Sequence, residues 1–154
     1  MASIQLTLPV DTAPSATWDA VADFGAVHER LVPGFLVDCR SDGADRVVTF
    51  GNGAVARERL VSLDPVQRRL VYSVVESSIG LTHHQASVEV LDPPDAPDGS
   101  DGSEPHGSTI RWSADLLPDE LAPTVRQMME QGAAAIGRTL SAPSLSTPRS
   151  GRAG

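Results

Sequence analysis

The 154-residue sequence contains no lysine, because all twelve of its positively charged side chains are arginine. A mechanism that forms a Schiff base on lysine is therefore excluded. The single cysteine, Cys39, excludes an internal disulfide and a metal site made of cysteines alone. Aromatic residues make up 4% of the chain, so valine, leucine, isoleucine and alanine must form most of the interior.

Positive charge is scarce relative to negative charge, with a formal net charge of −8 and a pI near 4.8. Nucleic acids and anionic membrane surfaces bind basic faces, so we expect neither as a partner. No apolar stretch approaches the length that spans a membrane, and no cationic segment followed by an apolar run opens the chain. We therefore expect a cytoplasmic location.

Common cofactor and nucleophile motifs are also missing. Gly51-Asn52-Gly53 joins two predicted strands, which indicates a hairpin turn and not a phosphate-binding loop. No serine lies in a G-x-S-x-G motif. The adjacent His83 and His84 point to opposite faces of a strand, and no helix carries a metal-binding His or Glu-His pair. We expect neither a cofactor nor a metal.

Alternation of apolar and polar residues, interrupted by turn signals, predicts seven strands in an antiparallel meander. In one of them, Phe35, Val37 and Cys39 alternate with polar residues. A pair of short helices is predicted within residues 11–31, with Ser15 as the N-cap of the first. The predicted strands span residues 3–10, 35–41, 45–50, 54–64, 67–78, 82–91 and 108–116.

A long helix is predicted over residues 119–140, with a single apolar stripe at three- and four-residue spacing. This stripe must cover the concave face of the sheet, and Gly132 would allow the two to approach closely. The result is one α+β domain over residues 1–140. Residues 92–108 predict a flexible acidic loop, and residues 141–154 a disordered tail. The stripe consists of Leu121, Val125, Met128, Met129, Gly132, Ile136 and Leu140.

This order of elements, together with local sequence, resembles the START-like helix-grip superfamily called SRPBCC. Its members include polyketide cyclases and dehydrases and lipid-transfer domains. The segment RERLVSLDPVQRRLVYSVVESSIGLTHHQASVEV is similar to the central strands of that superfamily, PSATWDAVADF to its first helix and IRWS to its last strand. The E-R-L-x-x-L-D strand followed by Arg-Arg resembles the abscisic-acid-receptor-like branch, whose S-G-L-P-A gate reads G-N-G-A here.

The resemblance implies a large apolar cavity between the sheet and the final helix. It also implies that residues 51–53 and 78–81, including Gly80 and Leu81, occupy gate-like and latch-like positions at the mouth of the cavity. On the strand over residues 54–64, the alternation leaves open which face is concave, and the resemblance places Glu58 toward the cavity.

Alternation places His84 and Ala86 on the inward face of their strand and His83 outside. Trp112 is predicted to face inward as well, whereas the pattern leaves the direction of Tyr72 open. The residues we expect to contact a ligand are Glu58, Leu60, Tyr72, His84, Ala86, Trp112, Val125, Met128 and Met129.

Glu58 and His84 are the candidate catalytic residues. Burial favours the neutral forms of both, which suits general acid and base roles near neutral pH. The alternative is that both side chains anchor a ligand by hydrogen bonds. Their strands are separated by one neighbour, which is too far for a tight dyad, so we expect them either to contact two ends of one ligand or to share a water.

Three functions are compatible with these residues. The first is a carrier or sensor that binds a small hydrophobic or polycyclic molecule. The second is a cofactor-independent cyclase or dehydratase that acts on a polyketide-like substrate. The third is a homodimer or a complex with another protein, formed at the mouth of the cavity. The small number of inward polar groups favours binding over catalysis.

Overall fold

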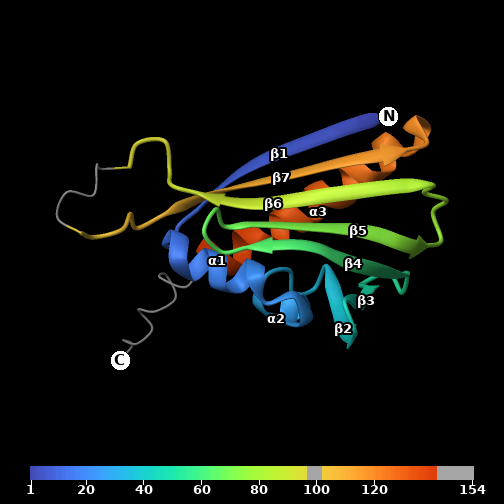
Figure 1. The fold of residues 1–154 in the computed structure, drawn as a ribbon, viewed down its shortest axis with the longest axis horizontal. Helices are drawn as coiled ribbons and strands as arrows, with labels where there is room; N and C mark the ends of the chain where they lie inside the picture. The colour runs from blue at the N-terminus through green and yellow to red at the C-terminus, as the bar shows by residue number, and fades with distance from the viewer. Residues whose placement is uncertain (97–101, 142–154) are drawn as a thin grey trace, which may run out of the picture.

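The computed structural model describes residues 1–96 and 102–141. Its order of elements is the one predicted from the sequence (Figure 1). The strands are β1 (Ala2–Val10), β2 (Leu36–Asp42), β3 (Asp45–Phe50), β4 (Val55–Asp64), β5 (Arg69–Ser77), β6 (His83–Leu91) and β7 (Ser108–Leu117). The helices are α1 (Pro14–Ala22), η1 (Phe24–Ala26), α2 (Val27–Arg30), η2 (Asp119–Leu121) and α3 (Ala122–Ser141).

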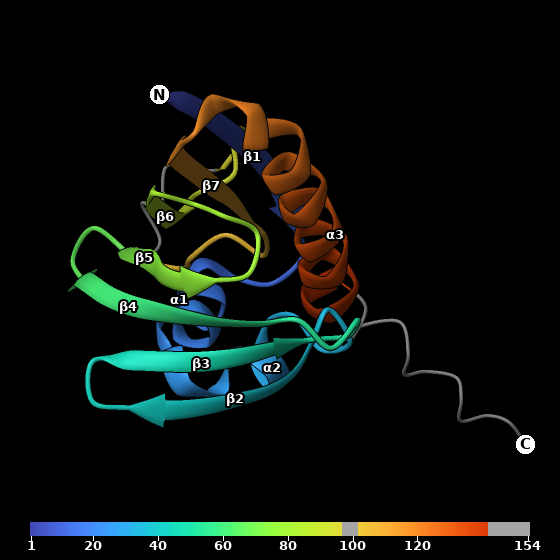
Figure 2. The same ribbon diagram turned by 90° about the vertical axis from the view of Figure 1, so that its right-hand side faces the viewer.

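The strands form one antiparallel sheet in the order β1-β7-β6-β5-β4-β3-β2. The first strand thus pairs with the last, and the strands between them form a meander. Figure 2 shows the sheet curving around α3, while α2 lies near β2 and α1 contacts β6 and β7. The predicted α+β fold is confirmed.

Helix α3 packs its apolar stripe against the concave face of the sheet. A β-carbon on Gly132 would lie 2.9 Å from Cη2 of Trp112 on β7 and 3.3 Å from Cε2 of Phe35. The glycine therefore lets both aromatic rings lie against the helix backbone, as the close approach predicted for this position requires. The buried residues of the stripe are Val125, Met129, Gly132, Ala135, Ile136 and Leu140.

The predicted N-cap of α1 is wrong. The helix begins at Pro14, which suits a first helical position because its ring fixes φ. Ser15 instead donates from its backbone N–H and its hydroxyl to the carboxylate of Glu104, at 3.0 and 2.6 Å. A carboxylate at a helix N-terminus is stabilised by the helix dipole. Part of the acidic segment is thereby anchored, whereas residues 97–101 and 142–154 of the predicted loop and tail lie outside the described residues.

The alternation predicted for residues 35–41, with Val37 on the apolar face, is also wrong. The register of β2 against β3 shifts between Leu36 and Asp38, which breaks the strict alternation. Leu36 is buried, whereas Val37 is 57% exposed. Cys39, two residues further on, is half-buried.

The outer face of the sheet is held by an ion-pair cluster between β3 and β4. Asp45 accepts hydrogen bonds from Arg59 Nε at 2.8 Å and from Arg57 Nη1 at 3.0 Å. The bonds from Arg59 and then Arg57 lower the pKa of Asp45 to about 2. Because Asp45 and Arg59 are directly opposite in register, the cluster favours the observed pairing of the two strands.

The low pKa of Asp45 predicts how stability depends on pH. The unfolded-state pKa is near 3.8 and the folded-state pKa is about 2. The contribution of Asp45 is therefore complete above about pH 5 and is lost as the pH falls toward 2. We expect the Tm of the native sequence to fall more steeply between pH 5 and pH 2 than the Tm of Asp45→Asn. The exposed Asp38 forms no ion pair with any described residue, so Asp38→Asn should show the native slope. Equal slopes for all three proteins would contradict the assignment.

Candidate functional site

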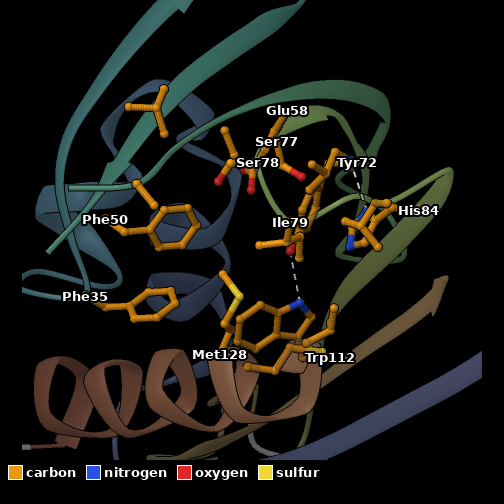
Figure 3. A pocket seen from close by; sticks show the side chains of 17 residues that line it. Phe35, Phe50, Glu58, Tyr72, Ser77, Ser78, Ile79, His84, Trp112 and Met128 are labelled. Atoms are coloured by element: carbon orange, nitrogen blue, oxygen red, sulfur yellow. Dashed lines mark hydrogen bonds between the residues drawn. The ribbon is translucent and has the colours of Figure 1, made fainter. Parts of the chain in front are cut away.

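A pocket of about 100 Å³ lies between the concave face of the sheet and α3. Its walls come from β3 to β7, from the 78–81 segment, from Phe35 and from the first half of α3. In Figure 3, Phe35 and Phe50 lie on one side and Tyr72 and His84 on the other, with Trp112 and Met128 next to the helix. The resemblance implied a large cavity between the sheet and the final helix, and the pocket found in that place is small.

Eight predicted site residues line this pocket, namely Glu58, Tyr72, Leu81, His84, Trp112, Val125, Met128 and Met129. Within the described residues, the lining does not include Leu60 or Ala86. Ala86 is 2% exposed and lies between Tyr72 and Ala114 in the sheet, where its short side chain is part of the core. Leu60 packs partly buried against the same core.

The two loops expected at the mouth contribute in a different way from that predicted. Gly51, Asn52 and Gly53 form the turn itself, while the flanking Phe50 and Ala54 line the pocket. In the other loop, Gly80 turns the chain with a φ of +94°, and its neighbours Ile79 and Leu81 line the pocket. Both loops therefore place apolar side chains at the pocket and use glycine for the turn.

Aromatic side chains are concentrated at this site. The chain has three Phe, two Trp and one Tyr. Four of these six, Phe35, Phe50, Tyr72 and Trp112, line the pocket. The rings of Phe35 and Phe50 are in edge contact with centroids 5.3 Å apart, and Trp112 Nε1 donates to the Tyr72 hydroxyl at 3.1 Å. A second hollow of about 60 Å³, toward α1 and α2, shares these four residues and Glu58.

Glu58 is held by an arginine that the sequence analysis did not select. Arg46 lies directly opposite Glu58 in the β3–β4 register and donates from Nε to Oε1 at 2.7 Å. Its Nη1 donates to the Phe24 carbonyl at 3.0 Å, and its guanidinium lies 3.8 Å from the centroid of the Phe24 ring. The arginine and the carboxylate are both buried. The pairing gives the Glu58 side chain a buried partner that the sequence analysis did not anticipate.

His84 occupies the point where the ladder between β5 and β6 ends. The last paired residues are Tyr72 and Ala86. Beyond them, the Ser73 hydroxyl donates to the His84 carbonyl, and the Val74 backbone N–H donates to His84 Nδ1 at 3.0 Å. Burial lowers the pKa of His84 below its ordinary value of 6.5, so the ring is neutral at pH 7. His83 is exposed, as the alternation predicted.

Tyr72 is also neutral, because burial raises the pKa of its hydroxyl well above the ordinary value of 10. Its ring lies beside that of His84, with centroids 5.8 Å apart. The pocket thus combines apolar and aromatic walls with two neutral polar rings and one paired carboxylate.

Residues 1–96 and 102–141 contain no group of three His, Cys, Asp or Glu side chains arranged to hold a metal ion. None of the helices in these ranges has both the length and the apolar composition that a bilayer-spanning segment needs.

Comparison with known proteins adds a match at the level of the family. The family model described as polyketide cyclase/dehydrase and lipid transport matches residues 1–141. No curated protein sequence matches the chain.

Solved structures share the fold at low sequence identity. The protein XoxI from Bacillus cereus is 17% identical, with a TM-score of 0.76 over 91% of this chain and 96% of the other. A START superfamily protein from Mycobacterium smegmatis is 13% identical, with a TM-score of 0.64 over 90% and 96% of the two chains. A norcoclaurine synthase point mutant from Thalictrum flavum, in complex with a transition-state analogue, is 19% identical, with a TM-score of 0.63 over 90% and 93%.

The Arg46–Glu58 pair makes a prediction about stability. Arg46→Met leaves a buried carboxylate without its counter-charge, so we expect a loss of about 3–5 kcal/mol in the free energy of unfolding. The double variant Arg46→Met/Glu58→Leu removes both charges and should recover most of that loss. Arg57→Met, on the outer face, should cost less than Arg46→Met because Arg57 is more exposed. Urea denaturation measures all three. A double variant no more stable than Arg46→Met would contradict this assignment of the loss.

Proposed function

Because the chain belongs to the polyketide cyclase/dehydrase and lipid-transport family, we propose that its pocket binds a small, hydrophobic, ring-containing molecule as a carrier or sensor. The observation that carries this proposal is the gathering of four of the six aromatic residues of the chain around one pocket. The same four side chains also pack in or against the hydrophobic core, so the proposal depends on the ring surfaces that they present to the pocket. Aromatic faces and edges bind flat rings well.

The helix side of the pocket supports the same proposal. Met128 and Met129 lie on α3 at the pocket, next to Val125. Methionine side chains are flexible and polarisable, so they can adapt to ligands of different shape. The turns at Gly51-Asn52-Gly53 and at Gly80 are the proposed points of entry. Gly53 and Gly80 have positive φ values, which suit sharp turns that present the flanking apolar residues.

A cyclase or dehydratase without a cofactor is the second candidate. The similarity of the fold to a norcoclaurine synthase structure with a bound transition-state analogue favours it, and Glu58 and His84 line the same pocket. Two contacts make proton transfer less favourable than binding. Glu58 Oε1 accepts from Arg46, and His84 Nδ1 accepts from the Val74 N–H, so neither group is poised as a free base.

Binding is tested with N-phenyl-1-naphthylamine, a neutral apolar dye whose fluorescence increases in dry surroundings. We expect saturable binding to the native protein. Val74→Trp should abolish it, because Val74 lines the pocket and the larger side chain fills the space. Val75→Trp is the matched control, since Val75 is 39% exposed on the opposite face of the same strand. This control should bind the dye like the native protein.

A second blocking variant guards against misfolding of the first. Ala54→Trp places the bulky side chain at the mouth, outside any strand, where it is easier to accommodate. Loss of dye binding in both blocking variants, with native circular dichroism and native binding by the control, supports the proposal. Equal binding by all four proteins would place the dye elsewhere and overturn the proposal.

A further inference from the structure

His84 presents a hydrogen-bond donor to the pocket. A backbone N–H can only donate, so Nδ1 of His84 carries a lone pair toward Val74. In a neutral imidazole the proton then resides on Nε2. The residue is 7% exposed, and no hydrogen bond to another described residue uses Nε2. The ring is thus a donor-only group at the pocket, fixed in one tautomer by the backbone of β5.

Tyr72 presents a second donor. Its hydroxyl oxygen accepts from Trp112 Nε1, so its own hydrogen is not part of that bond. Tyr72 is 7% exposed, and in the described part of the chain no acceptor takes this hydrogen. Figure 3 shows the Tyr72 hydroxyl and the His84 ring facing the same region of the pocket.

The two donors are neighbours on adjacent strands, with ring centroids 5.8 Å apart. A carbonyl oxygen has two lone pairs and can accept from both. We infer that the preferred ligand is a neutral carbonyl compound, such as a ketone, aldehyde or quinone, whose oxygen accepts from Tyr72 and His84 while its aromatic or polycyclic skeleton lies against the apolar walls. This inference rests on the proposed function, because it specifies the ligand of the same pocket.

The neutral class follows from the charge beside the donors. The carboxylate of Glu58 lines the same pocket as Tyr72 and His84, so any charged group of a ligand there would lie near the Arg46–Glu58 ion pair. The guanidinium of Arg46 is hydrogen-bonded to Glu58 and to the Phe24 carbonyl, and its central carbon lies 5.3 Å from the centroid of the Tyr72 ring. Because Arg46 is already paired with Glu58, a ligand carboxylate would meet no unpaired positive charge among the described lining residues of this apolar pocket, whereas a carbonyl oxygen carries no full charge and needs none.

Three probes of similar shape test the inference by displacement of the naphthylamine dye from the full-length protein. They are 2-acetylnaphthalene, 2-isopropenylnaphthalene and 2-naphthoate. The first and second differ by a carbonyl oxygen in place of a methylene group, and the third carries a carboxylate at the same position. We expect the ketone to bind about tenfold more tightly than the hydrocarbon, from two neutral hydrogen bonds. The carboxylate should bind more weakly than the ketone.

Variants of His84 and Tyr72 test whether a preference for the ketone over the hydrocarbon comes from these two donors. His84→Phe should reduce ketone affinity about fivefold while hydrocarbon affinity stays within about twofold. The unchanged hydrocarbon shows that the pocket is intact. His83→Phe is the matched control on the exposed face and should change neither affinity. Tyr72→Phe should also reduce ketone affinity, though less, because it frees Trp112 Nε1 to donate.

The outcomes separate this inference from the proposed function. Binding of the ketone and the hydrocarbon with equal affinity would overturn the carbonyl anchor and leave the apolar pocket intact. Tighter binding of the carboxylate would overturn the neutral class. Failure of all three to displace the dye would also overturn the carbonyl anchor, whereas the proposed function is overturned only if the blocking variants bind the dye as the native protein does. Long-range proton–nitrogen correlation spectra of His84 provide a readout independent of affinity, with the proton expected on Nε2. A proton on Nδ1 would overturn the inference.

Discussion

The structure depends on a geometric mismatch between a wide curved sheet and a single long helix. Seven strands spaced about 4.8 Å apart form a sheet wider than the roughly 10 Å diameter of one helix such as α3. The helix packs closely where Gly132 meets Trp112, while α1 packs against β6 and β7 and α2 against β2. Between these contacts, side chains from five strands and two loops surround a pocket instead of closing on each other. A cavity is therefore a consequence of this arrangement of elements.

The polar groups of the pocket are held by partners outside it. Glu58 is fixed by Arg46, which is itself bonded to the backbone of Phe24, and His84 is fixed by the backbone of β5. Groups with such support keep their orientation when a ligand arrives, and this reduces the entropy lost on binding. Buried ion pairs contribute little net stability, so the Arg46–Glu58 pair is better explained by positioning than by stabilisation.

The spacing of apolar residues predicted the fold, because the burial of one face imposes this spacing on each helix and strand separately. The stripe of α3 and the inward positions of His84 and Trp112 could be deduced in this way, and the match to the family confirms the resemblance to the SRPBCC superfamily. The resemblance to the abscisic-acid-receptor-like branch and the gate-like role of the loops at residues 51–53 and 78–81 remain predictions. What periodicity could not provide were relations between elements, namely the Glu104 carboxylate at α1 and the β2 bulge that exposes Val37. The pairing of Arg46 with Glu58 also depends on the register of β3 against β4. The position of Arg46 two residues before the apolar Val48 places both on one face of the strand, and this was a usable signal that Arg46 points inward.

The location of a bound ligand is tested most directly by NMR with methyl-labelled methionine. The chain has three methionines. Met128 and Met129 line the pocket, whereas Met1 is 65% exposed and serves as an internal reference. With 2-acetylnaphthalene bound, we expect intermolecular nuclear Overhauser effects from the naphthalene protons to the Met128 methyl group and none to that of Met1. Saturable binding without any contact to Met128 or Met129 would contradict a ligand site between the sheet and α3.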